Sequence, residues 1–318
     1  MSQSGLEIIL GYLSPIRPLL SQDDVDEVQI NEGGRRVFTK RRGVQQLESV
    51  ELDPDGLYGA IKRIAKAAGQ EVIEEEHKPL SPDFNCRFPT GERVAVMFSP
   101  HSVGGDTVTI RRFGALRMSL DEATEAGMLT REQADILKAA VESARNVIIS
   151  GNLGSGKTTL MNMLVAYIGE EERILSIENP CELVLKHTNV IRWEAQGKMT
   201  QRRLLESALR HGVDRVLIGE IRGEEALEFM ELLNVGLAGT ITSLHANSPE
   251  QALDRLLTCC LKSPGHPPVE ALKQQIGCSI DYSVHLTRDV RTGVRRVDGL
   301  VKIEGYDFSL DRFKVTPL

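Results

Sequence analysis

The stretch NVIISGNLGSGKTTL, residues 146–160, lies near the middle of this chain and carries its strongest structural signal. Its apolar beginning, residues 147–150, is rich in Val and Ile and predicts a buried strand. Residues 151–158 match G-x-x-x-x-G-K-[ST] at every defined position, and a predicted helix follows from Thr158. A strand, a glycine loop and a helix in this order predict a loop that binds nucleotide phosphates.

The residue types of this loop suit that chemistry. Glycines let backbone N–H groups turn inward around an anion, and the helix N-terminus adds a partial positive charge. Lys157 is expected to reach the β- and γ-phosphates of ATP, and Thr158 is expected to ligate Mg²⁺. The residues expected to bind the phosphates are Gly151, Asn152, Leu153, Gly154, Ser155, Gly156, Lys157, Thr158 and Thr159.

Two further apolar runs end in acidic residues. Residues 215–219 lead into Glu220, a candidate for the Mg²⁺ site and for polarising the attacking water. Because a helix is predicted just beyond, Glu220 could instead cap that helix or lie on the surface. Residues 174–177 lead into Glu178 and Glu182, and either glutamate is a candidate general base.

A histidine ends another apolar run. Residues 240–244 predict a buried strand, and His245 follows it directly. Spacing alone supports a packed or capping histidine as well as it supports a functional one.

Length and composition restrict the class of protein. The 318 residues, 41% of them hydrophobic, suffice for two globular domains. The formal net charge of −7 argues against binding to nucleic acid through the overall field of the protein. The five cysteines have no spacing typical of zinc sites and suit a reduced, cytosolic protein. No segment approaches the ~20 apolar residues of a membrane span, so we expect any membrane role to act through partners.

The order of predicted strands and helices changes near residue 114 and predicts two domains. Residues 1–113 predict an α+β domain with a mostly antiparallel sheet, residues 114–118 a linker, and residues 119–318 an α/β domain with a mostly parallel, doubly wound sheet. The expected strands are 25–31, 36–40, 84–88, 94–98, 107–111, 147–150, 174–177, 190–193, 216–218 and 240–244. The expected helices include 57–68, with Gly69 as its C-cap, and three that begin after Ser119, Thr130 and Ser248.

Four boxes together resemble the ATPase superfamily of type II and type IV secretion, type IV pilus and conjugal transfer systems. They are GNLGSGKTT (151–159, Walker A), SIENPCEL (176–183, Asp box), VLIGEIRGEEA (216–226, an atypical Walker B) and GTITSLHANSP (239–249, His box). Within this superfamily the chain is most similar to the type IV secretion and Tad pilus traffic ATPases. The resemblance implies an N-terminal PAS-like domain followed by a RecA-like P-loop ATPase domain, which assemble into a homohexameric ring.

The resemblance also assigns roles to further residues. It implies that Arg93 and Arg111 reach from the N-terminal domain toward the nucleotide phosphates, and that His245 senses or polarises the γ-phosphate. Arg112 and Arg222 are additional candidates for phosphate contacts, although either could be a surface or ion-pair arginine.

Three features depart from the pattern of the relatives. Asn179 stands where many relatives have aspartate, which shifts the carboxylate role to Glu178 and Glu182, with Glu182 the better match by alignment. The stretch LRHGVDR, residues 209–215, lacks the second arginine and the proline that relatives often carry. The four-cysteine zinc insertion of type II secretion and pilus-extension ATPases is absent from the sequence.

Together with the phosphate loop, the resemblance implies a hexameric cytoplasmic ATPase that powers assembly of, or transfer through, a type IV secretion or conjugation machine. Inner-membrane components of that machine are the expected partners, at the inner face of the cytoplasmic membrane. A pilus extension or retraction motor would have the same core and is the nearest alternative. A nucleic-acid motor is disfavoured by the acidic balance and by the single Trp. Asn179 motivates a third alternative, a scaffold that binds ATP without hydrolysing it.

Overall fold

The structure is a computed structural model that describes residues 11–22, 24–41, 43–67, 74–75, 78–79, 83–88, 91–112, 118–289 and 291–318. The chain divides into two compact units, residues 1–116 with 290–293, and residues 117–289 with 294–318. Residues 114–117 of the expected linker and the expected C-cap at Gly69 lie outside the described residues. The linker and its boundaries therefore remain predictions, and each unit is considered by itself below.

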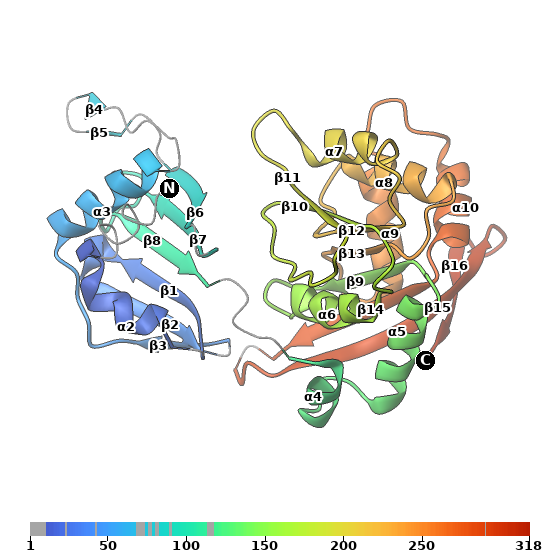
Figure 1. The fold of residues 1–318 in the computed structure, drawn as a ribbon, viewed down its shortest axis with the longest axis horizontal. Helices are drawn as coiled ribbons and strands as arrows, with labels where there is room; N and C mark the ends of the chain where they lie inside the picture. Colours follow the sequence, from blue (N-terminus) through green and yellow to red (C-terminus); the bar gives the residue numbers. More distant parts are fainter. Residues whose placement is uncertain are drawn as a thin grey trace. The chain divides into compact units, whose positions relative to one another are not determined.

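The N-terminal unit is built on a six-stranded sheet with the order β3-β2-β1-β8-β7-β6 (Figure 1). Every pairing in this sheet is antiparallel, as the sequence predicts. The strands are β1 (Val25–Asn31), β2 (Arg36–Arg41), β3 (Val44–Leu47), β6 (Asp83–Arg87), β7 (Arg93–Met97) and β8 (Thr107–Arg111). The other elements are η1 (Ser14–Ile16), α2 (Arg17–Leu20), η2 (Glu32–Gly34), α3 (Pro54–Ala67) and the short pair β4 (Glu74–Glu75) and β5 (Lys78–Pro79).

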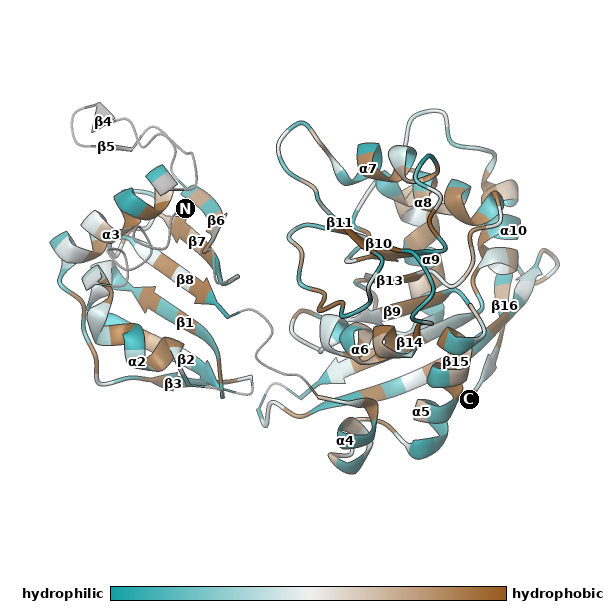
Figure 2. Ribbon diagram, in the orientation of Figure 1, coloured by the Kyte–Doolittle hydropathy of each residue, from teal (hydrophilic) through white to brown (hydrophobic). Residues whose placement is uncertain are grey.

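Helix α3 supplies much of the core of this unit. Leu57, Ile61 and Ile64 lie on one face of the helix and are buried in one cluster with residues of β1 and β8. Figure 2 shows hydrophobic residues along β1 and β8 and both kinds of residue on α3. The helix begins three residues before the predicted start, because Pro54 suits a first turn and the Asp53 carboxylate accepts the Gly56 N–H at 2.8 Å.

The C-terminal unit contains an eight-stranded sheet with the order β11-β10-β12-β13-β9-β14-β15-β16. The first six strands in this order run parallel, and β15 and β16 are added antiparallel at one edge. The strands are β9 (Val147–Gly151), β10 (Ile174–Glu178), β11 (Val190–Glu194), β12 (Arg215–Ile218), β13 (Ile241–Leu244), β14 (Tyr282–Arg288), β15 (Arg295–Asp307) and β16 (Arg312–Pro317). The helices are α4 (Leu120–Glu125), α5 (Arg131–Glu142), α6 (Lys157–Leu164), η3 (Val165–Tyr167), α7 (Gln201–Ala208), α8 (Glu225–Asn234), α9 (Pro249–Cys260) and α10 (Val269–Ser279).

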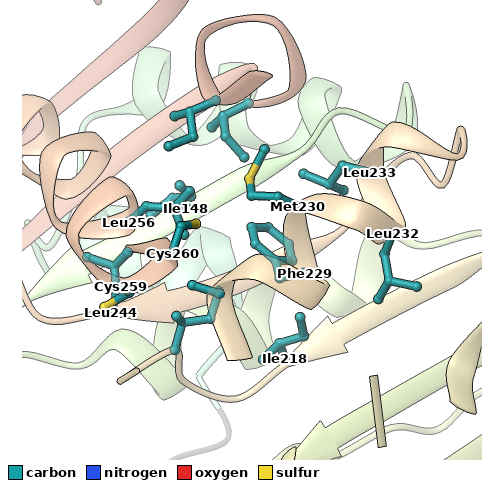
Figure 3. Close-up of a cluster of buried hydrophobic side chains, with 14 of the residues drawn as sticks. Ile148, Ile218, Phe229, Met230, Leu232, Leu233, Leu244, Leu256, Cys259 and Cys260 are labelled. Carbon is teal, nitrogen blue, oxygen red and sulfur yellow. The ribbon is translucent and has the colours of Figure 1, made fainter. Parts of the chain in front are cut away.

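Helices cover both faces of this sheet and create two separate cores. Because side chains alternate along a strand, Ile148 of β9 packs on one face while Val147 and Ile149 pack on the other. The Ile148 face is covered by α7, α8, α9 and α10, and the opposite face by α4, α5 and α6. Figure 3 shows Phe229 of α8 and Cys260 of α9 packed within the first core. The predicted doubly wound, mostly parallel sheet is confirmed.

The predicted helix starts of this unit are also confirmed. Ser119 and Thr130 each form a capping box, in which the side chain accepts an N–H from the third helical residue and that residue's side chain accepts the cap N–H. Ser248 caps α9 by accepting the N–H of Gln251, with Pro249 at the first helical position. These local signals therefore mark where three helices begin.

Candidate active site

The predicted polar residues gather at one edge of the parallel sheet. Strands β10, β12, β13 and β9 are neighbours in this order, and their carboxyl ends point the same way. Glu178 ends β10, Glu220 follows β12, His245 follows β13, and the glycine loop follows β9. The carboxyl edge of a parallel sheet is the usual place for a ligand in open α/β folds.

The glycine loop has a backbone that only glycine adopts readily. Gly151, Gly154 and Gly156 have φ values of 151°, 73° and 102°. A Cβ added at Gly151 would lie 2.4 Å from the carbonyl oxygen of Leu286 on β14 and 2.5 Å from Oγ of Ser155. The loop therefore leaves β9 through a space that no side chain could occupy.

Lys157 folds back over this loop. Its side chain is buried, and Nζ donates to the carbonyl oxygen of Gly151 at 2.9 Å and to that of Asn152 at 3.4 Å. These carbonyls hold the ammonium group beside the loop backbone, where a bound polyphosphate would add anionic partners.

His245 lies between Lys157 and Glu220. Its Nδ1 is 3.3 Å from Nζ of Lys157 and 3.0 Å from the carbonyl oxygen of Gly151, and its Nε2 is 2.9 Å from Oε1 of Glu220. With the proton on Nε2, the ring faces the carboxylate with a donor and leaves Nδ1 to accept from Lys157. With the proton on Nδ1, the ring donates to Gly151 instead. The imidazole therefore lies between the Glu220 carboxylate and the Lys157 ammonium group, within hydrogen-bond distance of each.

Glu220 is half-buried, with its side chain 19% exposed, and its two oxygens have different surroundings. Oε2 accepts a hydrogen bond from Arg222 at 2.8 Å, while Oε1 is buried without an aligned hydrogen-bond donor. The pKa of Arg222 is raised, first by this hydrogen bond and then by the charges of Glu220, Glu225 and Glu182. Glu182 therefore lies within electrostatic reach of the same guanidinium group.

Glu178 is deeply buried, at 2% exposure, unlike the other two glutamates. Its Oε2 accepts the backbone N–H groups of Glu182 and Leu183, at 2.5 Å and 2.9 Å. Burial raises the pKa of its carboxyl above the usual value. Glu178 thus holds the segment that carries Glu182, and Glu182, which is half-buried, is the better placed of the two to meet a water molecule.

Two polar atoms near the loop suit a charged ligand. Oγ of Ser155 is buried and has no hydrogen-bond partner within the described residues, and Oε1 of Glu220 is buried with the His245 ring 2.9 Å away but without an aligned hydrogen bond. Buried polar atoms without partners are rare in folded proteins, because their desolvation is not offset. Thr158 and Thr159 are half-buried in the first turn of α6, whereas Leu153 is 80% exposed at the tip of the loop. The loop and its acidic neighbour therefore fit a polyphosphate and its cation.

The predicted arginines of the N-terminal unit lie on adjacent strands. Arg93 and Arg111 are directly opposite each other on β7 and β8, and Nε of Arg111 is 3.8 Å from Oε1 of Glu27. Arg112 donates to the backbone carbonyls of Gln22 and Val25 within the same unit, which is a structural contact. That Arg93 and Arg111 contact the nucleotide remains a prediction.

The sequence interpretation missed residues on β14 and β15 that contact the end of β9 and the glycine loop. His285 and Arg295 hydrogen-bond to Ser150 and Gly154, respectively. The alternating pattern of residues 282–288 is a strand signal that could have located β14, but its place beside β9 depends on the tertiary fold.

Comparisons with known proteins agree with this arrangement. Residues 13–295 match the family model described as type II/IV secretion system protein. The chain is 29% identical over 290 residues to the conjugal transfer protein TrbB of Rhizobium radiobacter, covering 90% of this chain and 86% of the relative. It is 31% identical over 320 residues to the type IV secretion system protein PtlH homolog of Bordetella bronchiseptica, covering 90% and 92%.

The fold of this chain also resembles that of a solved structure. The VirB11 ATPase from the type IV secretion system of Brucella suis, in complex with sulphate, superimposes with a TM-score of 0.51 and 28% sequence identity. The match covers 95% of this chain and 97% of that chain. No helix among the described residues is both long and apolar enough to cross a membrane.

Proposed function

The chain belongs to the family of type II/IV secretion system proteins, and from this premise we propose that it hydrolyses ATP to power a type IV secretion or conjugation machine. Both relatives named above carry names from secretion or conjugation, which favours this function over a pilus motor. The VirB11 structure bears the printed description of an ATPase and matches almost the whole of both chains.

One observation carries the proposal. Lys157, His245 and Glu220 come from three separate segments of the chain. Nevertheless, the His245 ring lies 3.3 Å from Nζ of Lys157 on one side and 2.9 Å from Oε1 of Glu220 on the other. A lysine with only a structural role would not need a histidine and a half-buried glutamate in line beside it. A cation that offsets phosphate charge and an acid that orients water, both beside a phosphate loop, are groups that catalyse phosphoryl transfer.

The roles of these residues follow from their positions. The loop amides and Lys157 would bind the β- and γ-phosphates and offset the charge that develops on them. Glu220 or Glu182 would orient the attacking water and accept its proton, and His245 would link the γ-phosphate to Glu220. Glu178 would position Glu182 through the two backbone N–H groups that its carboxylate accepts.

Mg²⁺ is the metal that this site would take. Thr158 and Glu220 would hold it, since hydroxyl and carboxylate oxygens are its preferred protein ligands. When bound, the ion neutralises part of the charge on the phosphates. Arg222 shares the Glu220 carboxylate, so we infer that it limits the positions open to this side chain.

We infer a finer organisation from the family. The N-terminal unit would be PAS-like and the C-terminal unit RecA-like, with Arg93 and Arg111 stabilising the phosphates from the N-terminal side. The protein would form a homohexameric ring at the cytoplasmic face of the inner membrane, bound to inner-membrane components of its machine. Loss of the γ-phosphate would then release one domain from the other and produce motion.

Steady-state ATPase activity, measured over a range of protein concentrations, tests this function. We expect activity per chain to rise with concentration, because assembly would complete the sites, and to vanish in Lys157→Ala. Lys302→Ala is the matched control, since Lys302 is an exposed lysine on β15 of the same unit. Undiminished activity of Lys157→Ala would refute the assignment, and tight ATP binding without turnover at any concentration would favour a nucleotide-gated scaffold. Co-purification with pilus platform proteins would favour the pilus motor.

A further inference from the structure

The strand β14 and the start of β15 lie against the glycine loop but belong to none of the four sequence boxes. Strand β14 runs parallel to β9, with His285 opposite Ser150 and Leu286 opposite Gly151. The carbonyl oxygen of Leu286 occupies the space that a Cβ on Gly151 would need. The backbone of β14 therefore forms one wall of the loop at the residue where the loop leaves the sheet.

A buried hydrogen bond continues this wall one residue earlier. Nδ1 of His285 is 2.9 Å from Oγ of Ser150, which also donates to the carbonyl oxygen of Val284 at 3.2 Å. A hydroxyl that donates to a carbonyl accepts from the imidazole, so the His285 proton lies on Nδ1 in this arrangement. Both side chains are buried, which makes this contact part of the support of β9 and not a solvent-facing site.

Arg295 contacts the loop from the first residue of β15. Its Nε donates to the carbonyl oxygen of Gly154 at 3.1 Å. Its Cδ lies 3.2 Å from the position that a Cβ on Gly156 would take, and Cε of Met128 and Cδ2 of Leu286 lie 3.6 Å and 3.8 Å from that position. The stem of Arg295 thus packs beside Gly156 while its guanidinium group bonds to Gly154.

This contact acts on the part of the loop that contains Gly154 and Gly156. Gly154 and Gly156 have positive φ, and glycine loses more conformational freedom on ordering than other residues. The Gly154 carbonyl and the next N–H belong to one planar peptide group, so a cation on the oxygen fixes the orientation of both. In this structure that N–H, of Ser155, closes a turn onto the carbonyl oxygen of Asn152 at 3.2 Å.

We propose that Arg295 is a positioning residue that holds the phosphate loop in its nucleotide-binding shape through the Gly154 carbonyl. Arg295 does not take part in bond cleavage. It reduces the ordering that nucleotide binding would otherwise require, so it strengthens the binding of ATP and ADP alike. The inference rests on the proposed function and adds to it a binding determinant outside the four boxes.

The test compares Arg295→Gln and Arg295→Lys with the wild-type protein. Arg296→Gln is the matched control, because Arg296 is the next residue of β15 and is exposed. Binding of a fluorescent ADP analogue and the KM and kcat for ATP are measured for each. We expect Arg295→Gln to raise Kd and KM roughly tenfold or more, the effect of losing a charge-assisted hydrogen bond, with kcat changed less than about threefold. Arg295→Lys keeps a cation and should recover part of this affinity.

Three results would overturn the role of Arg295. Binding by Arg295→Gln within about twofold of wild type overturns the inference, as does a fall in kcat without a rise in KM. Equal losses in Arg295→Gln and Arg295→Lys also overturn it, because the cation would then not be the cause. If Arg295→Gln does not fold, Arg295→Lys must still show a raised KM with kcat kept. Failure of the wild-type protein to bind nucleotide would refute the proposed function, whereas normal wild-type binding with no effect of Arg295→Gln refutes the inference alone.

Discussion

Nε2 of His245 lies 2.9 Å from Oε1 of Glu220, although the two residues follow different strands. On its other side the same ring lies 3.3 Å from Nζ of Lys157. The three side chains therefore form a continuous line from the phosphate loop to the end of β12. Two predictions test this line directly, and three more test the fold that supports it.

Replacing Glu220 by Gln should abolish turnover while ATP still binds. The amide keeps the shape of the side chain but cannot accept a proton from water, so we expect kcat to fall by about 10²–10⁴-fold. The Kd for ATP should stay within about threefold, because the phosphate loop is unchanged. ATPase assays and nucleotide titration measure both. Glu224→Gln, at a half-exposed glutamate of the same segment, is the control, and residual turnover within tenfold of wild type would exclude Glu220 as an essential group.

Glu220 and His245 should act as one unit. We expect kcat of the double variant Glu220→Gln/His245→Asn to be no more than about threefold below that of the more severe single variant, because either change breaks the same line of side chains. A double-mutant cycle on kcat makes the measurement. Losses that multiply would show that the two side chains act independently and that their 2.9 Å approach is incidental.

Glu172 should be important for stability because it pairs with a buried arginine. Arg215 is 2% exposed, and its guanidinium group donates to Glu172 and to the carbonyl oxygen of Val141. Removing the carboxylate leaves that charge unpaired, so Glu172→Gln should cost about 3 kcal/mol in the free energy of unfolding. Urea unfolding measures this loss, with the exposed Glu171→Gln as control.

The same pair should respond to acid. The hydrogen bond with Arg215, foremost, lowers the pKa of Glu172 below its usual value of 4.5. The stabilisation is therefore complete above about pH 4.5 and is lost as the pH falls through the lower, folded-state pKa. The difference in stability between wild type and Glu172→Gln should shrink below pH 4.5, and a constant difference down to pH 2 would contradict the ion pair.

His285 should make the protein less stable in mild acid. Burial, the largest cause, lowers the pKa of His285 below 6.5, with Lys157 acting in the same direction and Asp298 and Glu250 acting against it. The unfolded chain then binds more protons than the folded one once the pH drops below about 6.5, so stability falls with pH in that range. Thermal unfolding between pH 7.5 and 5.5 should show a flatter profile for His285→Gln than for wild type. The exposed His101→Gln is the control, and equal slopes for all three proteins would refute this account.

Much of the fold could be predicted because its signals are local. The runs 25–31 and 107–111 are strands β1 and β8 at the predicted residues, and Ser119 and Thr130 begin helices as their capping boxes indicate. Strand β3 escaped prediction because all four of its residues are exposed, so its sequence lacks the apolar alternation of a half-buried strand. Strands β15 and β16 extend the sheet antiparallel, which interrupts the helix-strand alternation on which the prediction depended.

The sequence alone predicted the phosphate loop and singled out Lys157 and Glu220, because glycine positions and strand ends are readable along the chain, whereas the role expected of His245 came from the family resemblance. Only the tertiary structure decided which acids lie within reach of the loop. It buried Glu178 under two backbone N–H groups and placed Arg295 on the Gly154 carbonyl. The physical reason is that strand order and burial are set by packing among segments distant in sequence, and a polar side chain acquires its role from the neighbours that this packing provides.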